Sequence, residues 1–226
     1  MGMGKQKVAP AAACYALPCP VEAEGELGGK GAQLNGLCRC FGSGSGRLGV
    51  PDALVVPRSF YVACISSPGV SVYYGEAADE KTHPDGVTRA LERARTAILA
   101  YELPDEVFRE VRAFVAKHKR SGVACRSSAS CEDALDASYA GQFETVLNCT
   151  TAEDCERGIK EVWASTLGEG VVQYAGGDAM ALSKLVKGVT MAVVLQRQVA
   201  SAASGVMRFR PRPSVPSGPS VVLFQT

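Results

Sequence analysis

Residues 122–149 read GVACRSSASCEDALDASYAGQFETVLNC, and they carry the strongest structural signal of the chain. The two ends of this stretch, residues 122–126 and 143–149, have the apolar and β-branched content of short strands. The residues between them are polar or small and predict a loop. We therefore expect a strand that delivers an arginine and two serines to a loop, which then returns as a second strand.

Helical patterns surround this stretch. Apolar residues recur at helical spacing over residues 87–101, and a second amphipathic helix begins at Pro104 and ends before Gly122. Downstream, Thr151 and Asp154 form a candidate capping box for a third helix. The apolar faces expected for these three helices are Val87, Leu91, Ala94, Ile98 and Tyr101; Val107, Val111, Phe114 and Val115; and Cys155, Ile159, Val162, Trp163 and Thr166.

The remaining elements follow from shorter signals. Residues 28–40 predict a glycine-rich turn and a short helix, with Ala32, Leu34 and Leu37 as its apolar positions. Residues 53–65 predict a strand followed by a helical turn, and residues 189–196 predict an almost continuously apolar strand. Residues 205–209 are expected to pair with that strand, and residues 221–224 to start another.

Composition excludes several classes of protein. The 226 residues carry a formal net charge of +1, which gives no reason to expect nucleic acid or an anionic membrane as a partner. No apolar run reaches the roughly 20 residues that a membrane-spanning helix needs. The nine cysteines are scattered, and we assign no metal ligand among them. We expect the cytoplasm as the compartment, with a plastid as the alternative, because acidic residues are absent before Glu22.

Two glycine motifs do not indicate nucleotide-binding loops. Residues 44–49 match G-x-G-x-x-G, but Val50 and Pro51 follow where a helix would have to begin, so this segment is predicted to be a linker. Gly29-Lys30 lacks the glycine four residues upstream and the following Ser or Thr of a phosphate-binding P-loop.

Three positions nevertheless suit a phosphorylated ligand. Lys30 is a mobile point charge between glycines, and Arg126 offers a bidentate fork to phosphate oxygens. Gly141, within Ser138–Gln142, suits a flap with inward-facing backbone N–H groups. The alternatives are a surface lysine, an ion pair of Arg126 with Glu132 or Asp133, and an ordinary loop. From its own surroundings, Gln196 is expected to be satisfied by neighbouring backbone.

Taken together, the motifs resemble a known family. They are residues 28–32, 125–133, 136–148, 162–165, 193–197 and 204–207, in this order. This series is similar to the N-terminal ATP-binding domain of phosphoenolpyruvate synthase and pyruvate phosphate dikinase, which rifampicin phosphotransferases share. The resemblance implies an α/β (α+β), ATP-grasp-like domain with a mostly antiparallel sheet and flanking helices. It further implies a poorly ordered extension over residues 1–24 and the family domain, incomplete at its C-terminus, over residues 25–226.

The resemblance also implies roles for individual residues. Lys30 and Arg126 would contact the phosphates of ATP and serve catalysis, Gly141 and Thr145 would line the nucleotide, and Gln196 would lie near the adenine or ribose. The enzymes of this family use ATP to phosphorylate a histidine of a separate domain, which then passes the phosphoryl group to pyruvate or another acceptor. The expected ligands are ATP and Mg²⁺, with the magnesium ligands beyond residue 226.

Two other functions remain open from the sequence. The chain could be a non-catalytic module that only holds nucleotide. It could also be regulated through Cys125 and Cys131, whose thiolates would be activated by the positive charge of Arg126.

Overall fold

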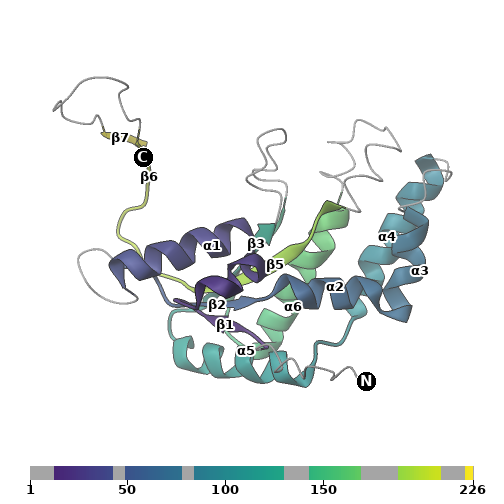
Figure 1. Cartoon of the computed structure of the whole chain (residues 1–226), viewed down its shortest axis with the longest axis horizontal. Coiled ribbons are helices and arrows are strands. Elements are labelled where there is room, and N and C mark those ends of the chain that lie inside the picture. The colour runs from purple at the N-terminus through teal and green to yellow at the C-terminus, as the bar shows by residue number, and fades with distance from the viewer. Residues whose placement is uncertain are drawn as a thin grey trace, which may run out of the picture.

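A computed structural model describes residues 13–42, 49–77, 84–129, 143–168, 188–209 and 222–225. These residues build a five-stranded sheet in the order β1-β2-β5-β3-β4, and all its neighbouring strands are antiparallel (Figure 1). Helices cover both faces of the sheet, so the predicted α/β class with an antiparallel sheet is confirmed. The strands are β1 (Tyr15–Ala16), β2 (Ala53–Val56), β3 (Val123–Ala129), β4 (Thr145–Cys149) and β5 (Met191–Arg197).

Strand β5 lies at the centre of the sheet. Val194 is opposite Val55 of β2 on one side and Arg126 of β3 on the other. Residues Met191–Gln196 are all buried, which explains why this segment is apolar almost without interruption. The strand predicted over residues 189–196 is confirmed.

One face of the sheet is covered by α1 (Glu24–Phe41), which follows the short 3₁₀ helix η1 (Val21–Ala23). The buried positions of α1 are Leu27, Gly31, Asn35 and Cys38. The predicted apolar positions were wrong in part, because Leu37 is 46% exposed while Asn35 is fully buried. A glycine and an amide lie on the inward face, so hydrophobicity alone does not identify it.

Asn35 explains how the segment before α1 is held. Its side-chain oxygen accepts a hydrogen bond from the Cys19 backbone N–H at 2.8 Å, and its amide group donates to the Cys19 carbonyl at 3.3 Å. Leu17 and Cys19 are buried beside Leu27. We expected residues 1–24 to be a poorly ordered extension; of these, residues 13–24 instead supply β1, η1 and the start of α1.

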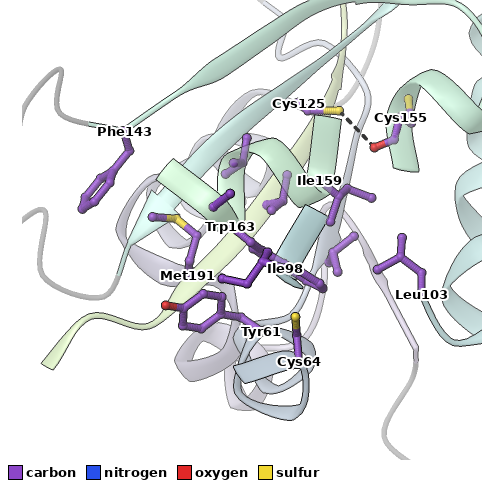
Figure 2. Close-up of a cluster of buried hydrophobic side chains, with 14 of the residues drawn as sticks. Tyr61, Cys64, Ile98, Leu103, Cys125, Phe143, Cys155, Ile159, Trp163 and Met191 are labelled. Atoms are coloured by element: carbon purple, nitrogen blue, oxygen red, sulfur yellow. Dashed lines mark hydrogen bonds between the residues drawn. The ribbon is translucent and has the colours of Figure 1, made fainter. Parts of the chain in front are cut away.

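The other face is covered by α2 (Arg58–Ser66), α5 (Asp105–His118) and α6 (Ala152–Ala164), and on these helices pack α3 (Pro68–Ala77), α4 (Pro84–Ala100) and the 3₁₀ helix η2 (Ser165–Leu167). Their common core is centred on Trp163, which is fully buried and meets Tyr61 edge to face at 6.2 Å (Figure 2). The apolar faces predicted for these helices are buried, with Phe114 and Tyr101 at the margin.

Helix α6 begins as its sequence predicts. The Thr151 hydroxyl accepts a hydrogen bond from the Asp154 backbone N–H at 3.0 Å, and the Asp154 carboxylate accepts one from the Thr151 backbone N–H at 3.1 Å. This reciprocal pair is a capping box, and it satisfies two donors that the first helical turn leaves without partners.

The C-terminal strands differ from the prediction. Strand β6 (Val206–Phe209) pairs with β7 (Val222–Gln225) in a separate two-stranded sheet and not with β5. The physical reason is that β2 and β3 already occupy both edges of β5. The predicted linker over residues 44–49 lies outside the described residues except for Gly49. Among the described helices, none combines the length and apolarity that a membrane crossing requires.

Candidate functional site

A groove of about 430 Å³ lies on the sheet where β3, β4 and the end of β5 meet. It is formed by backbone and side chains from the three strands and the residues that flank them. Its described walls combine two guanidinium groups, two amides and one hydroxyl with apolar side chains, and no carboxylate is among them. The lining residues are Pro51, Ala124, Arg126, Thr145, Leu147, Gln196, Arg197, Gln198 and Val199.

Arg126 and Gln196 meet inside this groove. A guanidinium N–H of Arg126 donates to the Gln196 side-chain oxygen at 2.6 Å. In the register of the sheet Arg126 lies opposite Val194, so Gln196 is two residues further along β5 and its side chain points to the same face. From its surroundings alone we had expected backbone to satisfy the Gln196 side chain. Its oxygen is instead bound by the side chain of Arg126.

The bond with Gln196 leaves N–H donors of Arg126 for a ligand. A guanidinium has five N–H donors, and Gln196 accepts from one of them. Within the described ranges Arg126 forms no ion pair with a carboxylate. Glu132 and Asp133, the alternative partners named from the sequence, lie outside those ranges.

Thr145 lies directly beside Arg126. The two residues are opposite each other in the β3–β4 pairing, so their side chains lie on the same face of the sheet. Thr145 is exposed, and its hydroxyl can donate and accept hydrogen bonds. The structure therefore brings Arg126, Thr145 and Gln196 into one groove. Gly141 lies outside the described residues.

Lys30 reaches the same strand from α1. Its ammonium group donates to the Ser127 hydroxyl at 3.2 Å. Ser127 follows Arg126 directly and lies just past the last residue of β3 that is paired with the described part of β4. Lys30 and Arg126 thus approach adjacent residues of β3, although consecutive side chains of a strand point to opposite faces.

Gly28 and Ser128 allow α1 to approach β3 closely. Gly28 has a φ of +68°, and a Cβ at this position would overlap the Ser128 carbonyl oxygen. The Ser128 hydroxyl donates to the Leu27 carbonyl at 2.7 Å and accepts from the Gly31 backbone N–H at 2.9 Å. Only glycine combines this positive φ with the absence of a Cβ at residue 28. The glycine-rich turn thus positions Lys30 through its backbone.

The sequence did not single out the far end of the groove. Leu147 and Val199 are 57% and 56% exposed and line it with apolar surface. Gln198 ties the neighbouring strand in place, because its side-chain oxygen accepts from the Asn148 backbone N–H at 2.9 Å. Arg197 also lines the groove. As the only cation of the most apolar strand, at its last residue, it could have been recognised from the sequence.

The thiol hypothesis needs a correction. Cys125 is fully buried and points away from the face that carries Arg126. Hydrogen bonds with Cys149 and Cys155, together with burial, raise the pKa of Cys125 well above its usual value. Arg126 therefore does not activate this thiol. Cys131 lies outside the described residues.

Comparison with known proteins shows the family to which the chain belongs. The family described as the pyruvate phosphate dikinase AMP/ATP-binding domain matches residues 24–219. The chain belongs to this family. A rifampicin phosphotransferase of a Streptomyces species is 35% identical over 194 residues, which cover 80% of this chain and 20% of that protein. A probable phosphoenolpyruvate synthase of Archaeoglobus fulgidus is 34% identical over 195 residues, which cover 80% and 24%.

The matched region is thus about a fifth to a quarter of each relative's length. A phosphoenolpyruvate synthase of Aeropyrum pernix shows the same proportion, with 29% identity over 80% of this chain and 22% of the relative. The resemblance expected from the six sequence motifs is confirmed for the family. The roles of Lys30, Arg126, Gly141, Thr145 and Gln196 remain predictions.

Proposed function

We propose that this chain binds ATP in the groove between β3, β4 and β5. Membership of a family described by AMP and ATP binding supports the ligand class. The observation that carries the assignment of the groove is the bond between Arg126 and Gln196, because it places a cation and an amide side by side. The guanidinium would bind phosphate oxygens, and the amide would hold the ribose or base.

The rest of the groove suits the remaining parts of the nucleotide. Lys30 would add a second positive charge near the phosphates, and Thr145 a hydroxyl donor. The exposed apolar surfaces of Leu147 and Val199 would contact the flat base. Gly141 would belong to a flap over the phosphates, as expected from its sequence context.

Magnesium accompanies ATP in most enzymes that transfer phosphoryl groups. The described lining of the groove contains no carboxylate and so does not fit a magnesium site formed by protein side chains. We therefore assign no step to the metal.

The activity proposed for the whole protein is ATP-dependent phosphoryl transfer. The named relatives are phosphotransferases and phosphoenolpyruvate synthases, which supports this class. The chain's own cations would neutralise the charge that develops on the transferred group. The first acceptor would be a histidine of a separate domain, and the final acceptor pyruvate or a related compound. We propose no nucleic-acid or membrane partner, and we place the protein in the cytoplasm or a plastid.

One observation favours a second function. No carboxylate or histidine lines the described part of the groove, so none of the described lining residues is an obvious general base. A module that holds nucleotide without catalysis fits this arrangement. Transfer of label from ATP to a histidine in the full-length protein supports the enzyme; binding without any transfer supports the module.

Calorimetric titration tests the site itself. Arg126→Ala should weaken ATP binding by about 10- to 100-fold, because a hydrogen bond to a charged group contributes about 1.5–3 kcal/mol. Binding of adenosine, which has no phosphate, should change far less. Arg109→Ala, which removes an exposed arginine of α5, is the control and should leave both affinities unchanged. Equal ATP affinity of the Arg126→Ala and control variants would disprove the assignment.

A further inference from the structure

Three cysteines from three different elements meet in the core. Cys125 comes from β3, Cys149 from the end of β4 and Cys155 from the first turns of α6. Their three sulfur atoms all lie within 4.8 Å of one another. They are 0%, 2% and 0% exposed, respectively. The dashed line in Figure 2 joins the Cys125 sulfur to the backbone carbonyl oxygen of Cys155, 3.8 Å away.

The separation of the Cys125 and Cys149 sulfurs is that of two ligands of a common ion. The sulfurs of Cys125 and Cys149 are 3.8 Å apart, far beyond the roughly 2.05 Å of a disulfide bond. Zinc–sulfur bonds of about 2.3 Å in tetrahedral geometry place two sulfurs about 3.8 Å apart. The Cys125 and Cys149 sulfurs therefore already have the separation that one shared metal ion requires, and the Cys155 sulfur lies within 4.8 Å of both.

The cluster is closely packed against the helix at Gly158. A Cβ at Gly158 would be 3.0 Å from the Cys125 sulfur and 3.4 Å from the Val146 Cβ, so a larger residue would compress the cluster. Among the described residues no histidine, carboxylate or further cysteine joins the three thiols. The donor set is thus three sulfurs in an apolar environment, which selects a soft, thiolate-binding cation.

We propose that Cys125, Cys149 and Cys155 form a binding site for one thiophilic divalent cation, of which Zn²⁺ is the common biological example. Binding displaces the three thiol protons to solvent, forms three metal–sulfur bonds and changes no oxidation state. A divalent ion with three thiolates leaves one net negative charge, whereas a monovalent ion leaves two, and buried charge is costly. Among the described residues the site offers three ligands and no fourth.

The site would join parts of the molecule that the groove depends on. Cys125 precedes Arg126 in β3, and the three thiols connect β3, β4 and α6. A bound ion would therefore crosslink these elements from the face opposite the groove. Its expected effect is a higher midpoint of thermal unfolding, whether or not the groove binds ATP.

Metal titration of the reduced full chain tests this site. One equivalent of Cd²⁺, used as a spectroscopic probe, should produce thiolate-to-metal charge-transfer absorption, both in the metal-free protein and, by displacing the bound ion, in the Zn²⁺-loaded protein. Cys149→Ala and Cys155→Ala should each weaken binding of both ions at least tenfold. Cys64→Ala removes another fully buried thiol of the same core, which lies apart from the cluster in Figure 2, and should bind like the wild type.

A second measurement covers variants that fail to fold. Wild-type protein should be alkylated with and without Zn²⁺ and the modified cysteines identified by peptide mapping. Zn²⁺ should protect Cys125, Cys149 and Cys155 from slow alkylation, while the exposed Cys40 should react equally in both samples. No charge-transfer absorption, or protection confined to other cysteines, would overturn the proposal.

Discussion

The guanidinium of Arg126 donates to the side-chain oxygen of Gln196 at 2.6 Å, across the boundary between β3 and β5. The bond orients both side chains in the groove and leaves the remaining donors of each for a ligand. Because Arg126 and Gln196 are 70 residues apart in the chain, only the sheet brings them together.

The first prediction concerns this pair. Gln196→Glu should weaken ATP binding by about tenfold or more, because the new carboxylate would form an ion pair with Arg126 and repel phosphate. Gln196→Ala removes the acceptor without adding charge and should have a smaller effect. Calorimetry gives both affinities. Tighter ATP binding by the glutamate variant would contradict the role of Arg126 in binding phosphate.

The second prediction concerns Gly28. Gly28→Ala should lower the free energy of unfolding by more than about 2 kcal/mol, because the side chain would meet the Ser128 carbonyl and strain a backbone with φ of +68°. Denaturant unfolding measures this cost. Gly36→Ala, in the same helix with nothing within 4 Å of the added Cβ, should be neutral or slightly stabilising. Equal stability of the two variants would show that α1 does not require the close approach at Ser128.

The third prediction concerns the start of α6. Thr151→Ala should cost about 1 kcal/mol of stability, because the Asp154 backbone N–H loses its acceptor. Thr151→Ser keeps the hydroxyl and should stay close to the wild type. The midpoint of urea unfolding at constant slope reports both values. A loss of the same size in the serine variant would show that the methyl group, and not the cap, matters.

The fourth prediction concerns pH. Burial lowers the pKa of His118 below its usual 6.5, and the nearby cations Lys117 and Arg197 act in the same direction, while Asp52 opposes them. The unfolded chain therefore binds more protons at this site than the folded chain between the lowered pKa and 6.5. Stability should fall as the pH falls through that window.

Unfolding measured from pH 7 downward checks this expectation. In His118→Gln the loss of stability just below pH 6.5 should be smaller than in the wild type, because the titrating group is absent. His83 and Asp52 are present in both proteins, and the pKa of Asp52 is lowered by its hydrogen bond from Lys117, so it stays charged in this range. Identical pH profiles would contradict a neutral, buried His118.

Local signals predicted those parts of the fold in which neighbouring residues act together. The cap of α6 depends on Thr151 and Asp154, three residues apart, and it was correctly predicted. The inward face of α1 was predicted only in part, because Asn35 is buried through bonds to Cys19, which no helical pattern encodes. The pairing of β6 failed for a similar reason, since it depends on which edges of β5 are free.

The candidate site shows the same division. Arg126 and Lys30 were recognised by their residue types and neighbours, but the sequence did not predict that Lys30 contacts Ser127. It also gave no reason to group Cys125 with Cys149 and Cys155, because 24 and 30 residues separate them from Cys125. Contacts between distant segments depend on strand order, which single-sequence patterns do not specify.

The central place of β5 has a consequence for synthesis. During translation, β2 and β3 leave the ribosome well before β5, yet in the finished sheet each of them pairs with β5. Until residues 191–197 emerge, the nascent chain can form helices and the β3–β4 hairpin, but β2 lacks its larger neighbour. The exposed strands of such an intermediate would be targets for chaperones, and the groove would be complete only after β5 has been inserted.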